Sequence, residues 1–243
     1  MRKKRKKTTF RPAPILWGLL VVNCYAGLNY SKMTSITKAR AAGVPLYDRD
    51  RIEDILMQVP NIPCARIDSK KIESEVMLLP EVDQAELTRN VFGNALLKVR
   101  YRTPVARLVG RDHVVLSVDG ILYRASQVPT DLPWIHLSSG GPPTLVAMAG
   151  NWQPASLAAL AVYSRQNYPG RTIRIEVNER GVVCLNIDSG RVILGSCDDL
   201  DLKLKTLEAR LQKNPQELAS EQELNLTLPS APTVVPIKPG KKQ

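Results

Sequence analysis

Residues 79–106 constrain the fold of this chain most strongly, because they combine two alternating apolar patterns with prolines at both ends. Pro80 cannot continue a helix, since it lacks an N–H group and its ring clashes with the preceding turn. After it, apolar and polar residues alternate at 85–88 and again at 95–102, as in half-buried strands, and Asn90, Gly93 and Asn94 supply a turn. Pro104 stops or bends the second strand. The stretch therefore predicts a helix end, a hairpin and a second stop, without catalytic residues.

The residues before Pro80 predict a strand and two helices. A weak strand signal covers 34–47, with a turn at 43–45. Asp50 and Glu53 are spaced as a capping box for a helix that Pro60 ends, and Asp68 or Ser69 is placed to cap a second helix that ends at Pro80. Together with the hairpin, this order predicts a small α+β unit in which two helices lie on a sheet.

After Pro104 the sequence predicts short strands and two more helices. Asp119-Gly120 is a strong hairpin signal between apolar strands, and Pro154 occupies a favoured first helical position. A second helix is expected after Asp198 or Asp199, with Leu200, Leu204, Leu207 and Leu211 on one stripe. The expected strands cover 114–118, 121–123, 132–137, 172–177, 183–187, 192–194, 224–228 and 233–237. The whole chain is therefore expected to be an α+β protein with a β-rich second domain.

The net charge of +11 is concentrated at the two ends of the sequence. Seven basic residues and no acidic ones lie within residues 1–14, which we interpret as a cytoplasmic tail, and Lys238, Lys241 and Lys242 lie in or beside a basic tail expected to be disordered at 239–243. Subtracting these ten charges leaves +1 for the rest of the chain. A nucleic-acid interface needs basic residues on the folded part, so this class of partner is not expected.

Residues 15–33 are mostly apolar and follow the basic tail directly. Dense positive charge on one side favours a membrane-spanning helix with its N-terminus in the cytoplasm, and Trp17 and Tyr30 suit the two membrane interfaces. A cleaved signal peptide is the alternative, because Ala39-Arg40-Ala41 has the form of a cleavage site, although it lies well beyond the apolar run. A buried core helix fits poorly, since the segment lacks periodicity.

The sequence contains no recognisable catalytic or metal-binding pattern. Cys24, Cys64, Cys184 and Cys197 are not spaced as a zinc site, and a two-residue turn at Ser189-Gly190 would place Cys184 opposite residue 195, so we expect four free thiols. The two histidines, His113 and His136, have no second ligand or nucleophile near them in the sequence. Asp198, Asp199 and Asp201 lack the oxygen spacing of a calcium loop, and 140–143 lacks the lysine of a phosphate loop. We expect no enzyme activity and no cofactor.

The ordered residues around the hairpin resemble a known family. They are Leu79, Pro80, Val82, Ala85, Leu87 and Arg89, then Leu96 and Val99, then Arg102, Pro104, Val105 and Ala106, with Asp119, Gly120 and Gly195 further along. This pattern resembles the FtsQ/DivIB family of bacterial cell-division proteins, at the junction between their POTRA and β domains. Two positions depart from the family pattern: Phe92-Gly93 replaces an aromatic-proline pair, and Tyr101 replaces an acidic residue.

The resemblance implies a division protein without enzymatic activity. It implies a POTRA-like domain at 34–106 and a β-rich domain at 107–238, held at the division septum by an inner-membrane anchor. It also implies FtsB/FtsL-like partners and a role in localising and regulating septal peptidoglycan synthesis. The alternative is a POTRA-type adaptor, secreted or anchored, for another envelope machine. An enzyme with a substrate cleft in the β-rich domain is the third class, but no residues support it.

The last strands offer the candidate interaction site. Residues 225–228 and 233–237 carry no charge, whereas exposed sheet edges are normally protected by charge or proline. One interpretation is an internal hairpin with no exposed edge; the other is an edge to which a partner adds a strand. The resemblance favours the second, because the family binds FtsB and FtsL in this region. The candidate partner-binding residues are Leu224, Asn225, Leu226, Thr227, Leu228, Val234 and Val235.

Overall fold

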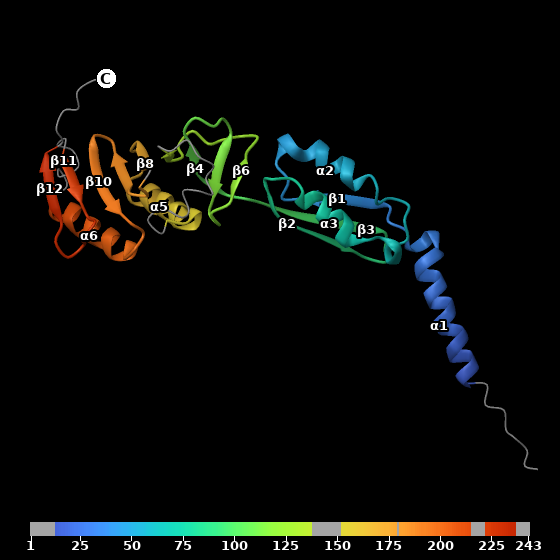
Figure 1. Cartoon of the computed structure of the whole chain (residues 1–243). Helices are drawn as coiled ribbons and strands as arrows, with labels where there is room; N and C mark the ends of the chain where they lie inside the picture. The colour runs from blue at the N-terminus through green and yellow to red at the C-terminus, as the bar shows by residue number, and fades with distance from the viewer. Residues whose placement is uncertain (1–12, 138–151, 179, 215–221, 237–243) are drawn as a thin grey trace, which may run out of the picture. The chain divides into compact units, whose positions relative to one another are not determined.

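The computed structural model describes residues 13–137, 152–178, 180–214 and 222–236 (Figure 1). It divides the chain into two compact units, Met1–Tyr101 and Arg102–Gln243. Helices and two β-sheets make up the described residues, so the predicted α+β class is confirmed. The predicted tails lie almost wholly outside the described residues, as do residues 140–143.

The first unit contains a three-stranded sheet in the order β1-β3-β2. Its strands are β1 (Lys38–Ala42), β2 (Val82–Arg89) and β3 (Asn94–Tyr101). β3 pairs antiparallel with β2 and parallel with β1. The buried side of β3 carries Ala95, Leu97 and Val99, as the alternating pattern predicted. These side chains share one core with residues of α2 (Arg49–Leu56) and α3 (Ser69–Met77), which confirms two helices packed on a small sheet.

The turn between β2 and β3 depends on Asn90 and Gly93. The Asn90 side-chain oxygen accepts hydrogen bonds from the backbone N–H groups of Phe92 (3.1 Å) and Asn94 (3.0 Å). Gly93 has φ +82°, a left-handed conformation that residues with a side chain adopt only with strain. Its carbonyl accepts hydrogen bonds from the N–H groups of Thr37 (2.8 Å) and Lys38 (3.0 Å), so the turn also positions the start of β1.

The two helices of the first unit begin differently. Asp68 caps α3 as predicted, because its carboxylate accepts a hydrogen bond from the Lys71 N–H at 3.2 Å. The capping box predicted from Asp50 and Glu53 is wrong: α2 is capped at Asp48, whose side chain makes no capping bond. The reason is tertiary, since the Asp48 carboxylate accepts a hydrogen bond from the Tyr101 hydroxyl at 2.6 Å and so ties the start of α2 to the end of β3.

The apolar segment forms helix α1 (Ala13–Tyr30), and many of its large apolar side chains are exposed. Across the described ranges, no helix combines the length and the apolarity needed to cross a membrane, so the predicted membrane-spanning helix at 15–33 is not supported. The helix is shorter than predicted because Ser31 starts a separate 3-10 turn, η1 (Lys32–Thr34). It also contains Asn23, whose amide donates to the Leu19 carbonyl of its own helix at 2.9 Å.

The second unit is built on a nine-stranded sheet in the order β12-β11-β10-β9-β8-β7-β4-β5-β6. Its strands are β4 (Pro104–Leu108), β5 (Val114–Ser117), β6 (Leu122–Arg124), β7 (Trp134–Leu137), β8 (Ile173–Val177), β9 (Val183–Ile187), β10 (Gly190–Gly195), β11 (Gln222–Asn225) and β12 (Thr233–Pro236). Three neighbouring pairs are parallel, namely β4 with β7, β7 with β8, and β10 with β11. Eight of these nine strands were predicted; β4 was missed, because Pro104 was expected to stop or bend a strand, and the spatial order was not predicted.

The two predicted helices of the second unit are α5 (Pro154–Asn167) and α6 (Leu200–Lys213). Leu157 and Leu160 of α5 and Leu204 and Leu207 of α6 belong to one buried cluster with the alternate apolar residues of the strands. Both helices therefore cover the same face of the sheet. Pro154 lies in the first turn of α5, and the apolar stripe of α6 points inward, as the sequence predicted. Asp199 is the N-cap residue of α6, but its side chain makes no capping hydrogen bond.

The boundary between the units lies earlier than expected. We placed it after Ala106, but the compact units divide between Tyr101 and Arg102. Pro104 begins β4 rather than ending the preceding strand, and Pro104, Val105 and Ala106 belong to the second sheet. A proline is tolerated at the first residue of a strand, where a missing N–H costs least. Pro104, which was expected to stop or bend the second strand of the hairpin, therefore marks the start of the second sheet.

The hairpin between β9 and β10 turns one residue earlier than predicted. Ile187 pairs with Gly190 and Cys184 with Ile193, so the turn residues are Asp188 and Ser189. Asp188 adopts φ +53°, and its carboxylate accepts a hydrogen bond from the Thr172 N–H at 3.0 Å, which holds this conformation. All four cysteines are free thiols, as expected.

Two glycines with the same φ allow the cost of backbone strain to be measured separately from the cost of a steric clash. Gly120 and Gly110 both have φ +77°, but a Cβ atom on Gly120 would lie 2.5 Å from the Ala155 nitrogen, whereas one on Gly110 meets nothing within 4 Å. We predict that Gly110→Ala lowers the free energy of unfolding by about 1 kcal/mol and Gly120→Ala by about 3 kcal/mol or more. Urea unfolding followed by tryptophan fluorescence measures both; equal losses would show that α5 does not press on this turn.

Candidate partner-binding edge

The last strand, β12, forms one edge of the nine-stranded sheet (Figure 1). It pairs antiparallel with β11, with Val234 opposite Leu224 and Val235 opposite Glu223. β11 in turn pairs parallel with β10, so β11 is an interior strand. Within the described ranges, no strand pairs with the outer side of β12. The two interpretations of this sequence were an internal hairpin with no exposed edge and an edge open to a partner strand; the described residues form a hairpin whose outer strand is an edge.

The candidate residues divide between a buried strand and an exposed one. Leu224 and Leu226 are buried in the main core, and the Leu226 N–H donates to the Ile193 carbonyl at 2.8 Å. β11 ends at Asn225 rather than at Leu228, which is 66% exposed. On β12, Val234 is 39% exposed and Val235 is 48% exposed. The predicted set therefore mixes core residues of β11 with surface residues of β12.

The edge is uncharged along its whole length. β12 reads Thr-Val-Val-Pro and follows Pro232, so charge does not protect it, although proline lies at both ends. An edge strand leaves alternate backbone N–H and C=O groups without a partner in the sheet, and such groups are a template for another strand. An approaching strand would meet valines whose side chains are already partly exposed. This arrangement is suited to main-chain recognition of an extended segment.

Contacts from the rest of the unit hold this hairpin in place. The Arg210 side chain of α6 donates to the Pro232 carbonyl at 3.2 Å, just before β12. Gly195, at the end of β10, has φ +70°, and a Cβ there would lie 3.1 Å from the Thr227 side chain. The indole N–H of the fully buried Trp152 donates to the Gly195 carbonyl at 2.8 Å. Gly195 is one of the residues that carry the family resemblance. Because it has no side chain, the segment after β11 can approach the end of β10 closely.

Lys203 is the residue beneath this region that the sequence analysis missed. Its side chain is 2% exposed, and its ammonium donates to the Ser196 carbonyl at 2.8 Å. Burial lowers the pKa of Lys203, and the nearby Asp198 and Asp199 carboxylates oppose this shift. The sequence did contain a signal for this burial. Lys203 lies three residues after Leu200 and four before Leu207, which places it on the apolar stripe of α6.

The remaining family-pattern residues have structural positions in both units. Leu79 and Val82 are buried in the first core, Ala85 packs against it, and Pro80 is exposed after α3. The Arg89 guanidinium donates to the Ser69 hydroxyl at the start of α3. In the second unit, the Arg102 carbonyl accepts a hydrogen bond from the Tyr123 hydroxyl at 3.2 Å. Asp119 and Gly120 lie in the turn between β5 and β6.

The side chains that could act in catalysis or metal binding lie at separate positions in the second unit. His113 lies in the turn before β5 with φ +63°, and His136 is exposed on β7. The Asp198 carboxylate accepts a hydrogen bond from the Ser196 hydroxyl at 2.8 Å. Among the residues with described positions, no three histidine, cysteine or acidic side chains gather as a metal site would require. The sheet edge is thus the best-defined candidate site.

Comparison of this sequence with protein-family models and with curated proteins found no match. Its function is therefore inferred from the residues and the geometry described above.

The shifted pKa of Lys203 gives a pH-dependent prediction. Because the pKa is lower in the folded state than its ordinary value of 10.5, the unfolded state binds more protons as the pH approaches that value. The free energy of unfolding of the wild type, measured relative to Lys203→Met, should therefore rise with pH in the alkaline range below 10.5. Urea unfolding at a series of pH values measures this difference. A decrease with rising pH would mean that the aspartates outweigh burial.

Proposed function

We propose that this protein is a non-enzymatic component of the bacterial division machinery that binds FtsB/FtsL-like partners through β12. In this role it helps to localise and regulate septal peptidoglycan synthesis. The observation that carries the proposal is the uncharged outer edge of β12, at the end of a β-rich unit that follows a small α+β unit. The order of these units and the motif residues around the first hairpin agree with the family resemblance.

Binding by strand addition follows from the chemistry of this edge. The backbone groups of β12 would bond to an extended segment of the partner and supply affinity, while Val234 and Val235 would contact its alternate side chains. β11 and α6 support the strand from behind, through the β11 ladder and the hydrogen bond from Arg210. The site therefore needs no catalytic group or cofactor; it needs a rigid, uncharged edge.

The proposal also places the protein at the inner membrane, with its N-terminus in the cytoplasm and both folded units outside. Its support is the exposed apolar surface of α1 together with the basic residues that precede it in the sequence. Positive charge next to an apolar segment is typical of the cytoplasmic side of a membrane. The location of the two units can be tested separately from partner binding.

An adaptor for another envelope machine is the second candidate function. It is favoured by a groove of about 890 Å³ in the first unit, between the outer strand β1 and α2, with the exposed Leu46 and Met57 among its lining residues. An extended segment could pair with β1 at this groove. A fluorescent fusion distinguishes the two functions, because the division protein should concentrate at midcell, whereas an adaptor should give a uniform peripheral signal.

A charge on the edge strand should weaken partner binding. Val235 lies opposite Glu223, so Val235→Lys places an ammonium on the edge while leaving the hairpin an opposite-charge pair. We predict that this variant weakens binding of purified full-length protein to soluble FtsB/FtsL-like ectodomains by about tenfold or more. Leu228→Lys is the matched control, since Leu228 is exposed but lies beyond β11.

Calorimetric titration measures the affinity, and thermal unfolding checks that each variant is folded. Equal affinity for wild type and Val235→Lys would remove β12 from the interface. Equal losses in both variants would point to a general effect of charge.

The topology is tested by cysteine labelling at an exposed position. Cys64 is buried, so Ser189→Cys, in the exposed turn between β9 and β10, is the better reporter. We predict that a membrane-impermeant maleimide labels this variant in spheroplasts as fully as in lysed cells. Labelling that requires lysis would place the second unit in the cytoplasm and contradict the proposed location.

A further inference from the structure

A row of polar and aromatic side chains crosses the second unit on one face of its sheet. The strand register places Arg107 of β4 beside Trp134 of β7, and Trp134 beside Arg174 of β8. Arg174 lies beside Asn186 of β9, which lies beside Arg191 of β10. These five residues therefore form one continuous line across five neighbouring strands, and we call it the arginine row.

The arginine row lies on the sheet face opposite the two helices. Leu108 and Ile135 line a small apolar hollow with Pro154 and Leu157 of α5, so they point toward the helices. Their neighbours Arg107 and Trp134 point the other way, because successive residues of a strand face opposite sides of the sheet. Arg174 is exposed, and the other four members of the row are half-buried.

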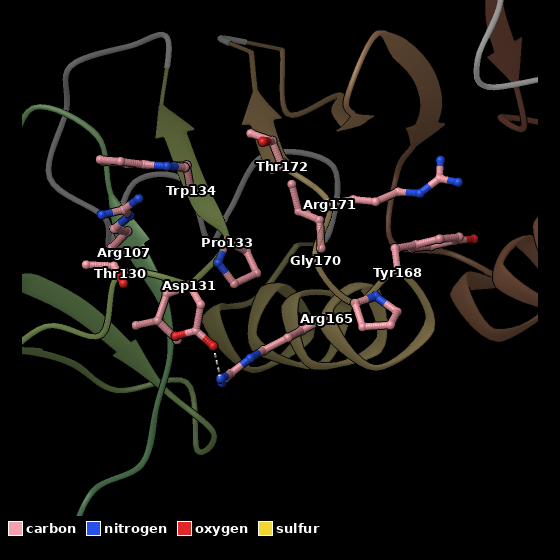
Figure 2. Close-up of a pocket in the computed structure, with 13 residues that line it drawn as sticks. Arg107, Thr130, Asp131, Pro133, Trp134, Arg165, Tyr168, Gly170, Arg171 and Thr172 are labelled. Carbon is pink, nitrogen blue, oxygen red and sulfur yellow. Dashed lines mark hydrogen bonds and ion pairs between the residues drawn. The ribbon is translucent and has the colours of Figure 1, made fainter.

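Two hollows follow the row (Figure 2). The first, of about 390 Å³, is lined by Arg107 and Trp134 among others, and the second, of about 260 Å³, is lined by Arg174, Asn186 and Arg191. Thr172 lines both, so the hollows adjoin. Figure 2 shows the Trp134 ring next to the Arg107 side chain at one end of the first hollow, with the Arg165–Asp131 ion pair at its lower rim.

Among the described side chains, two arginines of the row have no ion-pair partner. Neither Arg107 nor Arg174 has a carboxylate within 4.0 Å among the side chains described here. The Arg107 guanidinium lies 3.3 Å from the centroid of the Trp134 ring, and its buried Nε has no hydrogen-bond partner within the described structure. Arg191 differs, because Glu223 and Glu176 lie 3.8 and 4.0 Å away. Arg107, Trp134 and Arg174 thus form a cationic site with an aromatic centre.

We propose that this site binds an acidic peptide in the polyproline II conformation, with carboxylates three residues apart. The backbones of Arg107 and Arg174 lie two strands apart, which corresponds to about 9.6 Å at the usual strand spacing. Residues i and i+3 of a polyproline II helix lie on one face about 9.3 Å apart. Trp134 lies on the strand between the two arginines, and because the Arg107 guanidinium covers one face of its ring, the peptide would contact the other face. Guanidinium groups pair well with carboxylates.

The charge distribution argues against a nucleic acid on the same face. A single strand carries a phosphate on every nucleotide and needs a groove that follows this charge with basic residues. The row offers two unbalanced arginines, and the sequence between the basic tails carries a net charge of only +1. A ligand with sparse carboxylates matches this density.

Fluorescence anisotropy with labelled peptides and purified full-length protein tests the proposal. The probe is a Glu-Pro-Pro repeat, and the controls are a Lys-Pro-Pro repeat and a peptide with glutamate at every second position. Arg174→Gln is the principal variant because Arg174 is exposed, so its loss should leave the fold intact. Arg124→Gln is the matched control, since Arg124 is exposed on β6 and, by alternation from Tyr123, points to the helix side of the sheet.

We expect the Glu-Pro-Pro repeat to bind more tightly than both control peptides. Arg174→Gln should weaken it about tenfold, Trp134→Ala should weaken it further than Trp134→Phe, and Arg124→Gln should leave it unchanged. Thermal unfolding verifies that each variant is folded. The proposal is overturned if Arg174→Gln binds as well as the wild type, if the glutamate spacing has no effect, or if a single-stranded oligonucleotide binds the row more tightly than the peptide.

Discussion

The second unit depends on one requirement: a nine-stranded sheet must bury one face against the two helices among its described residues. Alternate side chains of the strands and the inner stripes of α5 and α6 meet in a single apolar cluster. Each strand therefore has a fixed register, since a slip of one residue would move its apolar side chains to the solvent. The same register also brings the side chains of the opposite face into line across the strands. The arginine row is a result of this register and not of any local motif.

Local patterns predicted the elements well because each depends on neighbours in the sequence. Pro80, the Asn90 turn, the Asp68 cap and the first turn of α5 all act within a few residues, and all were found as expected. The strand order was not predictable in this way, because β11 pairs with β10 in parallel only after α6 has intervened. Tertiary contacts also explain the local misses: Tyr101 engages Asp48, and the Thr172 N–H stabilises Asp188 in the turn.

The candidate site was predicted in part. An uncharged C-terminal segment was enough to suggest an edge, but sequence could not show that β11 is interior and that β12 alone is exposed. Lys203 lay on an apolar stripe and was passed over because lysine is so rarely buried. The arginine row could not have been found from sequence, since its members are brought together from five strands by pairings of long sequence separation.

The position of β12 has a consequence for how the protein matures. Its only described neighbour, β11, must first pair with β10, and that pairing follows the chain through α6, which buries Leu204 and Leu207 beneath the sheet. Parallel pairing across such a connection carries a loop-closure entropy that a tight hairpin does not. The edge therefore has a partner for its inner side only once β11 has joined the sheet, so a protein that binds β12 selects molecules in which this part of the sheet has formed.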